Sequence, residues 1–233
     1  MNFLSKADNL EKINNSKNFK KLLKVPKFFY FKKKELIKNK KKIYNFVNKN
    51  NTIIRSSSSY EDLKEKTNAG YFESRTLKKN SSKLIIEKKM QEVCEKLNLK
   101  DSIIIQEYIN PVDFSGVIFS ADQVTNSPYI VIEYDKSGKT NYVTSGKKSN
   151  NFRTYIYKFN HTKNKKFSFI YKVIQKLEAF FNSNRVDIEF AVKDNIFYLF
   201  QIRALPNPLK KKQKNLDDIL VNIKKKKKKL KKP

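Results

Sequence analysis

The most informative pattern in the sequence is the stretch RVDIEFAVKDNIFYLFQIRA (residues 185–204). Two runs rich in β-branched and aromatic residues flank a short polar segment at residues 193–195, which is typical of a β-hairpin. In the first run, apolar residues alternate with Asp187 and Glu189. Because successive side chains of a strand point to opposite faces, the hairpin is predicted to have one apolar and one polar face.

Four polar residues are predicted to share the second face. With a loop of three or five residues, Asp187 lies opposite Gln201, and Glu189 and Arg203 fall on the same face. With a two-residue loop, the pairing shifts by one residue and the four side chains no longer share a face. Two carboxylates, an amide and a guanidinium suit a metal–phosphate site, since Mg²⁺ prefers oxygen ligands. A solvated face with a cross-strand ion pair is the alternative, and spacing by itself leaves both open.

The rest of the body alternates helical and strand-like patterns, without an internal repeat. Ser5 and Asp8 have the spacing of a helix N-terminal capping box. Apolar periodicity predicts further helices in residues 33–49, 86–97 and 169–180, and strands in residues 28–31, 52–54, 103–106, 116–120 and 129–134. Cys94 falls on the apolar side of one of these helices and is predicted to be a buried thiol.

Composition excludes several classes of protein. The 39% of hydrophobic residues among 233 excludes a chain that is disordered throughout. One cysteine and one histidine exclude a disulfide framework, a Cys/His zinc site and a His–Cys catalytic pair. His161 is predicted to be a surface residue. No apolar run approaches the roughly 18–20 residues of a membrane span, and a secretory signal is not evident, so a cytoplasmic protein is expected.

The formal net charge of +30 is concentrated at the two ends of the chain. Residues 210–233 hold 12 lysines and 2 acidic residues, and we predict a largely disordered tail there. Such a tail can contact polyanions nonspecifically. Codon bias is the alternative origin of the lysines. No motif for specific nucleic-acid recognition is evident.

Five blocks of sequence together carry a family resemblance. They are LSKADNL (4–10), IIRSSSSYED with NAGYFES (53–62 and 68–74), IIIQEYI (103–109), SGVIFSAD with VT (115–122 and 124–125), and VDIEF with LFQIRA (186–190 and 199–204). In this order they resemble the nucleotide-binding domain of phosphoenolpyruvate synthase and pyruvate, phosphate dikinase. Residues 127–135 and 143–146 are similar to the phosphoenolpyruvate-synthase-like proteins of bacterial polysaccharide gene clusters, which points to polysaccharide biosynthesis.

The resemblance implies an α+β, ATP-grasp-like fold in which two subdomains clamp ATP with Mg²⁺. It places the nucleotide-binding domain in residues 1–209, with subdomain boundaries near residues 50 and 100, followed by the basic tail. In this family ATP phosphorylates a histidine on a separate swivelling domain. The chain stops resembling the family near residue 205, so by itself it is not expected to make phosphoenolpyruvate.

The resemblance also implies roles for particular residues. Arg55 and Arg203 would be catalytic, gripping phosphate oxygens and neutralising charge on the transferred group. Mg²⁺ would be held by Glu189 and Gln201 with support from Asp187. The nucleotide-binding set would be Lys6, Arg55, Gln106, Glu107, Ile109, Glu133, Glu189, Gln201 and Arg203, with the serines at 56–59 near the phosphates.

The expected function is therefore that of a kinase-like ATP-dependent phosphotransferase module. It would act on a histidine of a separate protein or on an unknown acceptor. Two alternatives remain open at this point: a non-catalytic nucleotide-binding regulator or decayed fragment, and a basic protein that binds nucleic acid or a membrane surface.

Overall fold

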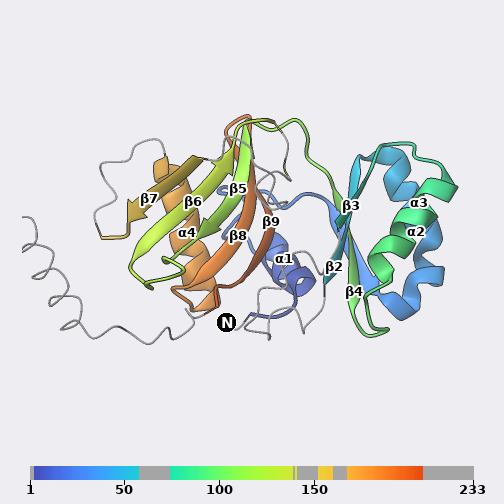
Figure 1. The fold of residues 1–233 in the computed structure, drawn as a ribbon, viewed down its shortest axis with the longest axis horizontal. Coiled ribbons are helices and arrows are strands. Elements are labelled where there is room, and N and C mark those ends of the chain that lie inside the picture. Colours follow the sequence, from blue (N-terminus) through green and yellow to red (C-terminus); the bar gives the residue numbers. More distant parts are fainter. Residues whose placement is uncertain (1–2, 58–73, 139, 141–151, 160–166, 207–233) are drawn as a thin grey trace, which may run out of the picture.

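The computed structural model describes residues 3–57, 74–138, 140, 152–159 and 167–206, which form two lobes (Figure 1). Each lobe is an antiparallel sheet with helices packed on it, so the expected α+β class is confirmed. The basic tail and His161 lie outside the described residues. Within the described residues, no helix has the length and hydropathy needed to cross a membrane.

The smaller lobe contains a four-stranded sheet in the order β1-β4-β2-β3. The chain enters this lobe at β1 and leaves it after β4. Its elements are β1 (Phe28–Lys32), η1 (Lys33–Glu35), α2 (Leu36–Lys49), β2 (Thr52–Ser57), β3 (Ser74–Leu77), α3 (Lys83–Cys94) and β4 (Ser102–Glu107). Ile54, Ile103 and Ile105 belong to the same buried cluster as residues of α2 and α3. Cys94 is buried there as predicted, and burial raises the pKa of its thiol.

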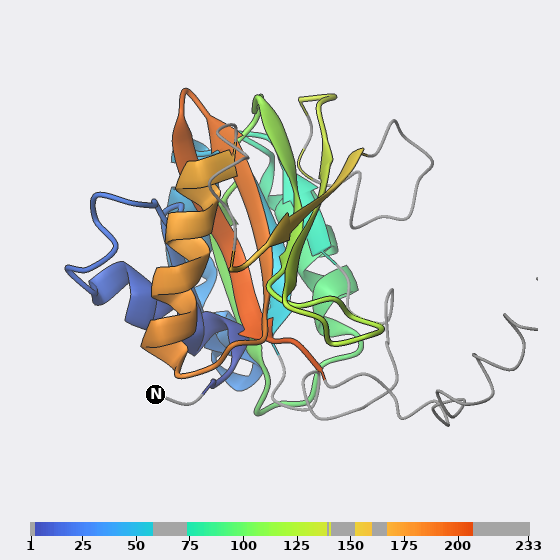
Figure 2. The ribbon, with the colours of Figure 1, turned by 90° about the vertical axis from the view of Figure 1, so that its left-hand side faces the viewer.

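The larger lobe contains a five-stranded sheet in the order β7-β6-β5-β8-β9. Its elements are α1 (Lys6–Asn15), β5 (Phe114–Phe119), β6 (Tyr129–Asp135), β7 (Phe152–Tyr157), α4 (Ser168–Phe181), β8 (Val186–Lys193) and β9 (Ile196–Ala204). Figure 2 shows α1 and α4 on the same side of this sheet. Both helices contribute to one core cluster with Ile188 and Phe190 of β8, so the opposite face of the sheet points away from the core.

A glycine permits the close approach of two central strands. A Cβ atom at Gly116 would lie 1.9 Å from the carbonyl oxygen of Glu133 and 2.7 Å from Cα of Tyr134. Both are backbone atoms of the neighbouring strand β6, so they cannot move aside as a side chain can. Only glycine allows β5 and β6 to pair as they do here.

The predicted hairpin is present, but its loop and register differ from the expectation. The loop has two residues, Asp194 and Asn195, with φ angles of 51° and 60°. Left-handed residues at both loop positions fit the twist of a tight hairpin. A β-bulge follows at the Glu189/Phe190 step, and it leaves Phe200 without a partner in the register. The prediction that Asp187 lies opposite Gln201 is therefore wrong.

The bulge preserves the polar face that a two-residue loop would otherwise have scrambled. Glu189 lies opposite Gln201, and Asp187 lies opposite Arg203. Without the extra residue, strict alternation from the turn would place Phe200 opposite Glu189 and turn Gln201 toward the core. The strict alternation expected for β9 is thus wrong, because one bulge residue resets which side chains face inward.

Candidate functional site

The polar face of the larger sheet forms two adjacent cross-strand rows. In the first row, Glu133, Val117, Glu189 and Gln201 are consecutive register partners on β6, β5, β8 and β9. The second row contains Phe119, Asp187 and Arg203. Both rows lie on the face opposite α4, because the alternate β8 residues are in the core. The structure therefore brings together the four hairpin residues singled out in the sequence.

Arg55 reaches this face from the smaller lobe. Its guanidinium forms an ion pair with the Glu189 carboxylate through Nη2 and Oε2. Its Nη1 donates to the carbonyl oxygen of Phe200 at 3.3 Å, so the bulge residue supplies a second acceptor. The side chains of Arg55 and Glu189 are only 15% and 21% exposed. This contact is a largely desolvated ion pair that joins the two lobes.

Two charged residues of the second row are paired with each other. Arg203 donates from Nε to Oδ2 of Asp187 at 2.7 Å. The Asp187 side chain is 8% exposed. Burial raises the pKa of this carboxyl above its usual range, and it outweighs the attraction of Arg203.

Glu189 has the opposite balance. Burial would raise the pKa of its carboxyl, but the positive charges of Arg55, Lys6 and Arg203 together outweigh burial and lower it. Two neighbouring carboxyls with pKa values shifted in opposite directions are typical of functional sites. Cations from both lobes therefore favour the ionised form of Glu189.

Helix α1 brings Lys6 to the site. Ser5 caps the helix by accepting a hydrogen bond from the amide of Asp8 at 3.3 Å, as its spacing predicted. The amide of Ala7, in the first turn, donates to the hydroxyl of Ser57 in the smaller lobe at 3.4 Å. The positive end of α1 therefore lies where the lobes meet, which favours anions.

Asn9 fixes this helix to β9, and the sequence reasoning missed it. The residue is fully buried. Its Nδ2 donates to the carbonyl oxygens of Leu4 at 3.0 Å and Ile202 at 3.2 Å, and its Oδ1 accepts from the amide of Leu4. An asparagine inside an amphipathic helix is an unfavourable choice. An asparagine on the apolar side of a predicted helix could therefore have indicated a buried polar contact.

The end of β4 and the connection after it carry the residues expected to bind the base. Gln106 is buried, and its Nε2 has no hydrogen-bond partner. In register it alternates with Ile105, a core residue, so it faces the larger lobe. Glu107 and Ile109 line a cavity of about 540 Å³, together with Tyr198 of β9. An orphaned buried donor on the face of the smaller sheet that points to the larger lobe fits a ligand with hydrogen-bond acceptors.

For Glu133 and the described serines among residues 56–59, the structure gives no contact with the cluster around Glu189. Glu133 lies in the first row, but its carboxylate is paired with Arg153 of β7. Ser56 and Ser57 are buried at the end of β2, whereas Ser58 and Ser59 lie outside the described residues. In the part of the chain that the structure describes, no group of three His, Cys, Asp or Glu residues could hold a metal. The expected Mg²⁺ set would rely on the amide of Gln201 as well as the two carboxylates.

Comparison with known proteins supplies structural likeness only. No protein-family model and no curated protein sequence matches the chain. A D-alanine–D-alanine ligase from Bacillus anthracis is similar at 14% identity, with 94% of this chain and 61% of that chain covered and a TM-score of 0.47. A RiPP-associated ATP-grasp ligase from Chryseobacterium gregarium, in complex with ADP and a leader and core peptide, is similar at 12% identity, with 86% and 54% covered and a TM-score of 0.46.

These findings correct the family assignment. The similar solved structures are ATP-grasp ligases, so the assignment to phosphoenolpyruvate synthase and pyruvate, phosphate dikinase is wrong. The phosphohistidine partner and the polysaccharide pathway that the resemblance implied are left without support. The α+β fold is as expected, and ATP-grasp ligases are among the solved structures similar to it. The chain spans 61% and 54% of the lengths of these two ligases, and at such identities the likeness concerns the fold alone.

Proposed function

We propose that the protein binds ATP with Mg²⁺ between its two lobes and acts as an ATP-dependent ligase. The observation that carries this proposal is the interlobe cluster around Glu189. Arg55 reaches it from the smaller lobe, and Gln201 and Arg203 stand beside it on β9. Cations from both lobes converge on one patch of oxygen donors, as a polyphosphate with its metal requires.

The charges of the cluster favour an anionic ligand. Arg55, Arg203 and Lys6 contribute three positive charges around the two carboxyl groups of Glu189 and Asp187. Because the guanidinium group of arginine is planar and carries several N–H donors, each arginine can bind two phosphate oxygens. The cavity lined by Glu107 and Ile109 would receive the base.

Arg55 and Glu189 must exchange partners when the nucleotide enters. Arg55 would release Glu189 and bind a phosphate oxygen, while Glu189, Gln201 and Asp187 would hold Mg²⁺. The ion would neutralise charge on the phosphate oxygens during transfer to an acceptor carboxylate. Arg203, beside the same row, would stabilise the negative charge that develops on the transferred group. The chain's own part is positioning and charge stabilisation, because phosphoryl transfer needs little covalent participation by the protein.

A second candidate, a nucleotide-binding protein without catalytic activity, is favoured by one observation. Both carboxylates of the proposed metal set are bound by arginines, Glu189 by Arg55 and Asp187 by Arg203. If the arginines hold the carboxylates permanently, nucleotide can bind without productive placement of the metal. This candidate predicts nucleotide binding that does not depend on Mg²⁺.

Calorimetric titration with ATP, with and without Mg²⁺, tests both candidates. Arg203→Met and Gln201→Leu should weaken binding about 10- to 100-fold, since hydrogen bonds to charged groups contribute roughly 1.5–3 kcal/mol. Arg75→Met is the matched control, because Arg75 pairs with Glu92 on the helix-covered side of the smaller sheet. Mg²⁺-dependent binding with ADP release in the presence of carboxylate and amine acceptors supports the ligase. No binding at millimolar ATP contradicts both candidates.

A further inference from the structure

Helices α2 and α3 leave an apolar cavity between them on the outer side of the smaller lobe, here called the α2–α3 groove. Figure 1 shows both helices on the side of the smaller sheet that faces away from the larger lobe. The cavity has a volume of about 340 Å³. Its apolar lining comes from both helices and consists of Leu36, Ile43, Ile86, Met90 and Cys94. A concave, mostly apolar site of this size is typical of a binding site.

The apolar surface continues from the cavity onto both rims of the groove. Ile37 of α2 is 82% exposed, and Leu84 of α3 is 78% exposed. Each lies three residues before a residue that lines the cavity, Lys40 on α2 and Glu87 on α3, and is therefore its neighbour on the helix surface. A small molecule that filled the cavity would leave both apolar side chains in water. A partner helix lying along the groove would cover them.

Internal contacts already satisfy the carboxylate of Glu87 in the groove. Its Oε1 accepts hydrogen bonds from Nζ of Lys40 at 2.9 Å and from the hydroxyl of Tyr44 at 2.7 Å. These two hydrogen bonds lower the pKa of the Glu87 carboxyl and connect α3 to α2. The groove is therefore formed before any partner arrives, which reduces the entropy lost on binding.

Lysines without acidic partners flank the groove on both sides. Lys41 follows Ile37 by one turn of α2, and Lys88 follows Leu84 by one turn of α3, and both lysines are exposed. Neither forms an ion pair or a hydrogen bond with another residue in the part of the chain that the structure describes. Helix α2 as a whole carries five lysines and no acidic residue. The positive charge of the rims is thus available to a partner.

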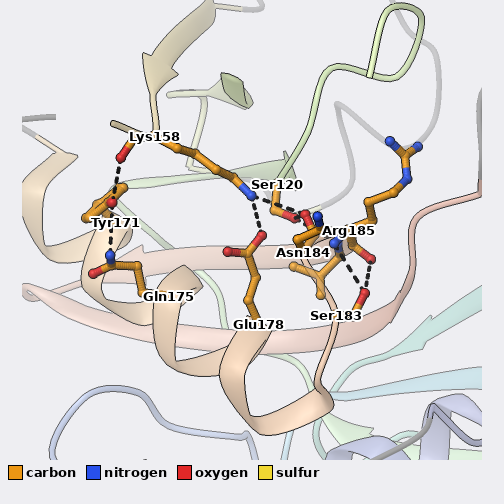
Figure 3. A network of polar contacts seen from close by, with 9 residues as sticks. Ser120, Lys158, Tyr171, Gln175, Glu178, Ser183, Asn184 and Arg185 are labelled. Atoms are coloured by element: carbon orange, nitrogen blue, oxygen red, sulfur yellow. Dashed lines mark hydrogen bonds and ion pairs between the residues drawn. The ribbon is translucent and has the colours of Figure 1, made fainter. Parts of the chain in front are cut away.

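The larger lobe shows how a lysine is neutralised within the chain. Lys158 forms an ion pair with Glu178 of α4, and its Nζ also donates to the carbonyl oxygen of Asn184 at 3.1 Å (Figure 3). Its side chain is only 15% exposed. Such a lysine has little to offer a partner, whereas Lys41 and Lys88 do. The unpaired charges therefore favour a negatively charged partner at the groove in particular.

We propose that the α2–α3 groove binds an acidic amphipathic helix of a partner protein. Its apolar residues would fill the cavity and cover Ile37 and Leu84, and its carboxylates would pair with Lys41 and Lys88. The α2 residues that line the cavity run from 36 to 44, about 12 Å, so about two helical turns would be in contact. A second copy of the chain is disfavoured, because it would bring the same lysines together. Nucleic acid would leave the apolar cavity unfilled.

Fluorescence anisotropy with the full chain at physiological salt tests the proposal. The probe is a labelled helical peptide of about 15 residues, with leucines at i, i+3, i+4 and i+7 on one face and glutamates on the other. One control peptide has the same composition in an order that scatters the leucines. A second control peptide has lysine in place of each glutamate. Both controls should bind at least about ten-fold more weakly than the probe.

Two double variants remove the two kinds of contact separately. Lys41→Glu/Lys88→Glu and Ile37→Ser/Leu84→Ser should each weaken probe binding at least about ten-fold and leave ATP binding unchanged. All four residues are exposed, so the fold should tolerate these changes. Replacement of two exposed lysines of α4 by glutamate, Lys172→Glu/Lys176→Glu, is the control with the same change in charge and should bind the probe as the natural chain does.

Methionine methyl groups report where the probe binds. The chain has two methionines, and Met90 lines the cavity, so probe binding should shift its methyl signal in NMR spectra of protein labelled at the methionine methyl carbons. An unchanged Met90 signal, equal binding of either control peptide, or no effect of the double variants overturns the proposal. So does displacement of the probe by an oligonucleotide or by anionic vesicles, or dimerisation through the groove in sedimentation experiments. None of these measurements requires nucleotide, so their failure leaves the proposed function to its own test.

Discussion

Removal of Arg55 should destabilise the protein by an amount that depends on Glu189. In Arg55→Met, the Glu189 carboxylate loses its nearest cation while its side chain stays about four-fifths buried. Breaking a fully buried pair costs about 3–5 kcal/mol, and a surface pair contributes at most about 1 kcal/mol. Lys6 and Arg203 still attract the carboxylate, so we expect a loss of about 2 kcal/mol in the free energy of unfolding.

The double variant Arg55→Met/Glu189→Gln separates the energy of the ion pair from the separate contributions of the two side chains. Because it leaves no unpaired charge, it should be more stable than Arg55→Met, with a coupling energy of about 1–2 kcal/mol. Urea unfolding of the four proteins of the cycle at pH 7 measures this coupling. A coupling below about 0.5 kcal/mol would show that the lobes are not joined by this pair.

The pH dependence has a definite sign. The pKa of Glu189 is lowered in the folded protein, so its ionisation stabilises the fold above the unfolded pKa of about 4.3, and this contribution is lost as the pH falls through the folded value. In Arg55→Met, burial is opposed by fewer charges, so the pKa of Glu189 rises. The difference in stability between the two proteins should be largest near neutral pH and shrink below about pH 4. A difference that does not vary between pH 7 and pH 3 would refute the electrostatic explanation.

Three further predictions follow from the fold. Gly116→Ala should cost at least about 3 kcal/mol in urea unfolding, because its Cβ would overlap backbone atoms of β6, whereas the neighbouring Ser115→Ala should cost less; equal losses would contradict the strand geometry. Deletion of Phe200 should keep Glu189 opposite Gln201, since it removes only the residue that has no partner in the register, and cross-strand NMR contacts between these two residues would show it. Cys94 should react with iodoacetamide at least about 100-fold more slowly than in urea at pH 8, because burial raises its pKa; a fast reaction under native conditions would contradict its burial.

Most of the secondary structure could be predicted from the sequence. Periodic apolar residues placed the four main helices and seven of the strands, but not β3 and β7, because burial of one face imposes a period of 3.6 or 2 on the residues that are buried. The sequence also selected Asp187, Glu189, Gln201 and Arg203 as one polar group. The register of β9 could not be predicted. A two-residue turn shifts the pairing by one residue and the bulge shifts it again, so Glu189 and Gln201 end on the same face although the loop is not the one expected.

The contacts of these residues depend on the tertiary structure. Arg55 is 134 residues from Glu189 in the chain, and their ion pair exists because β2 and β8 face each other across the two lobes. Asn9 holds α1 to Ile202 at a separation of 193 residues, and no local pattern reports such a contact. The opposite pKa shifts of Asp187 and Glu189 also arise from residues that are distant in the chain. Two carboxyls in neighbouring rows of one hairpin differ because burial and distant cations, rather than their sequence neighbours, set the charge each one carries.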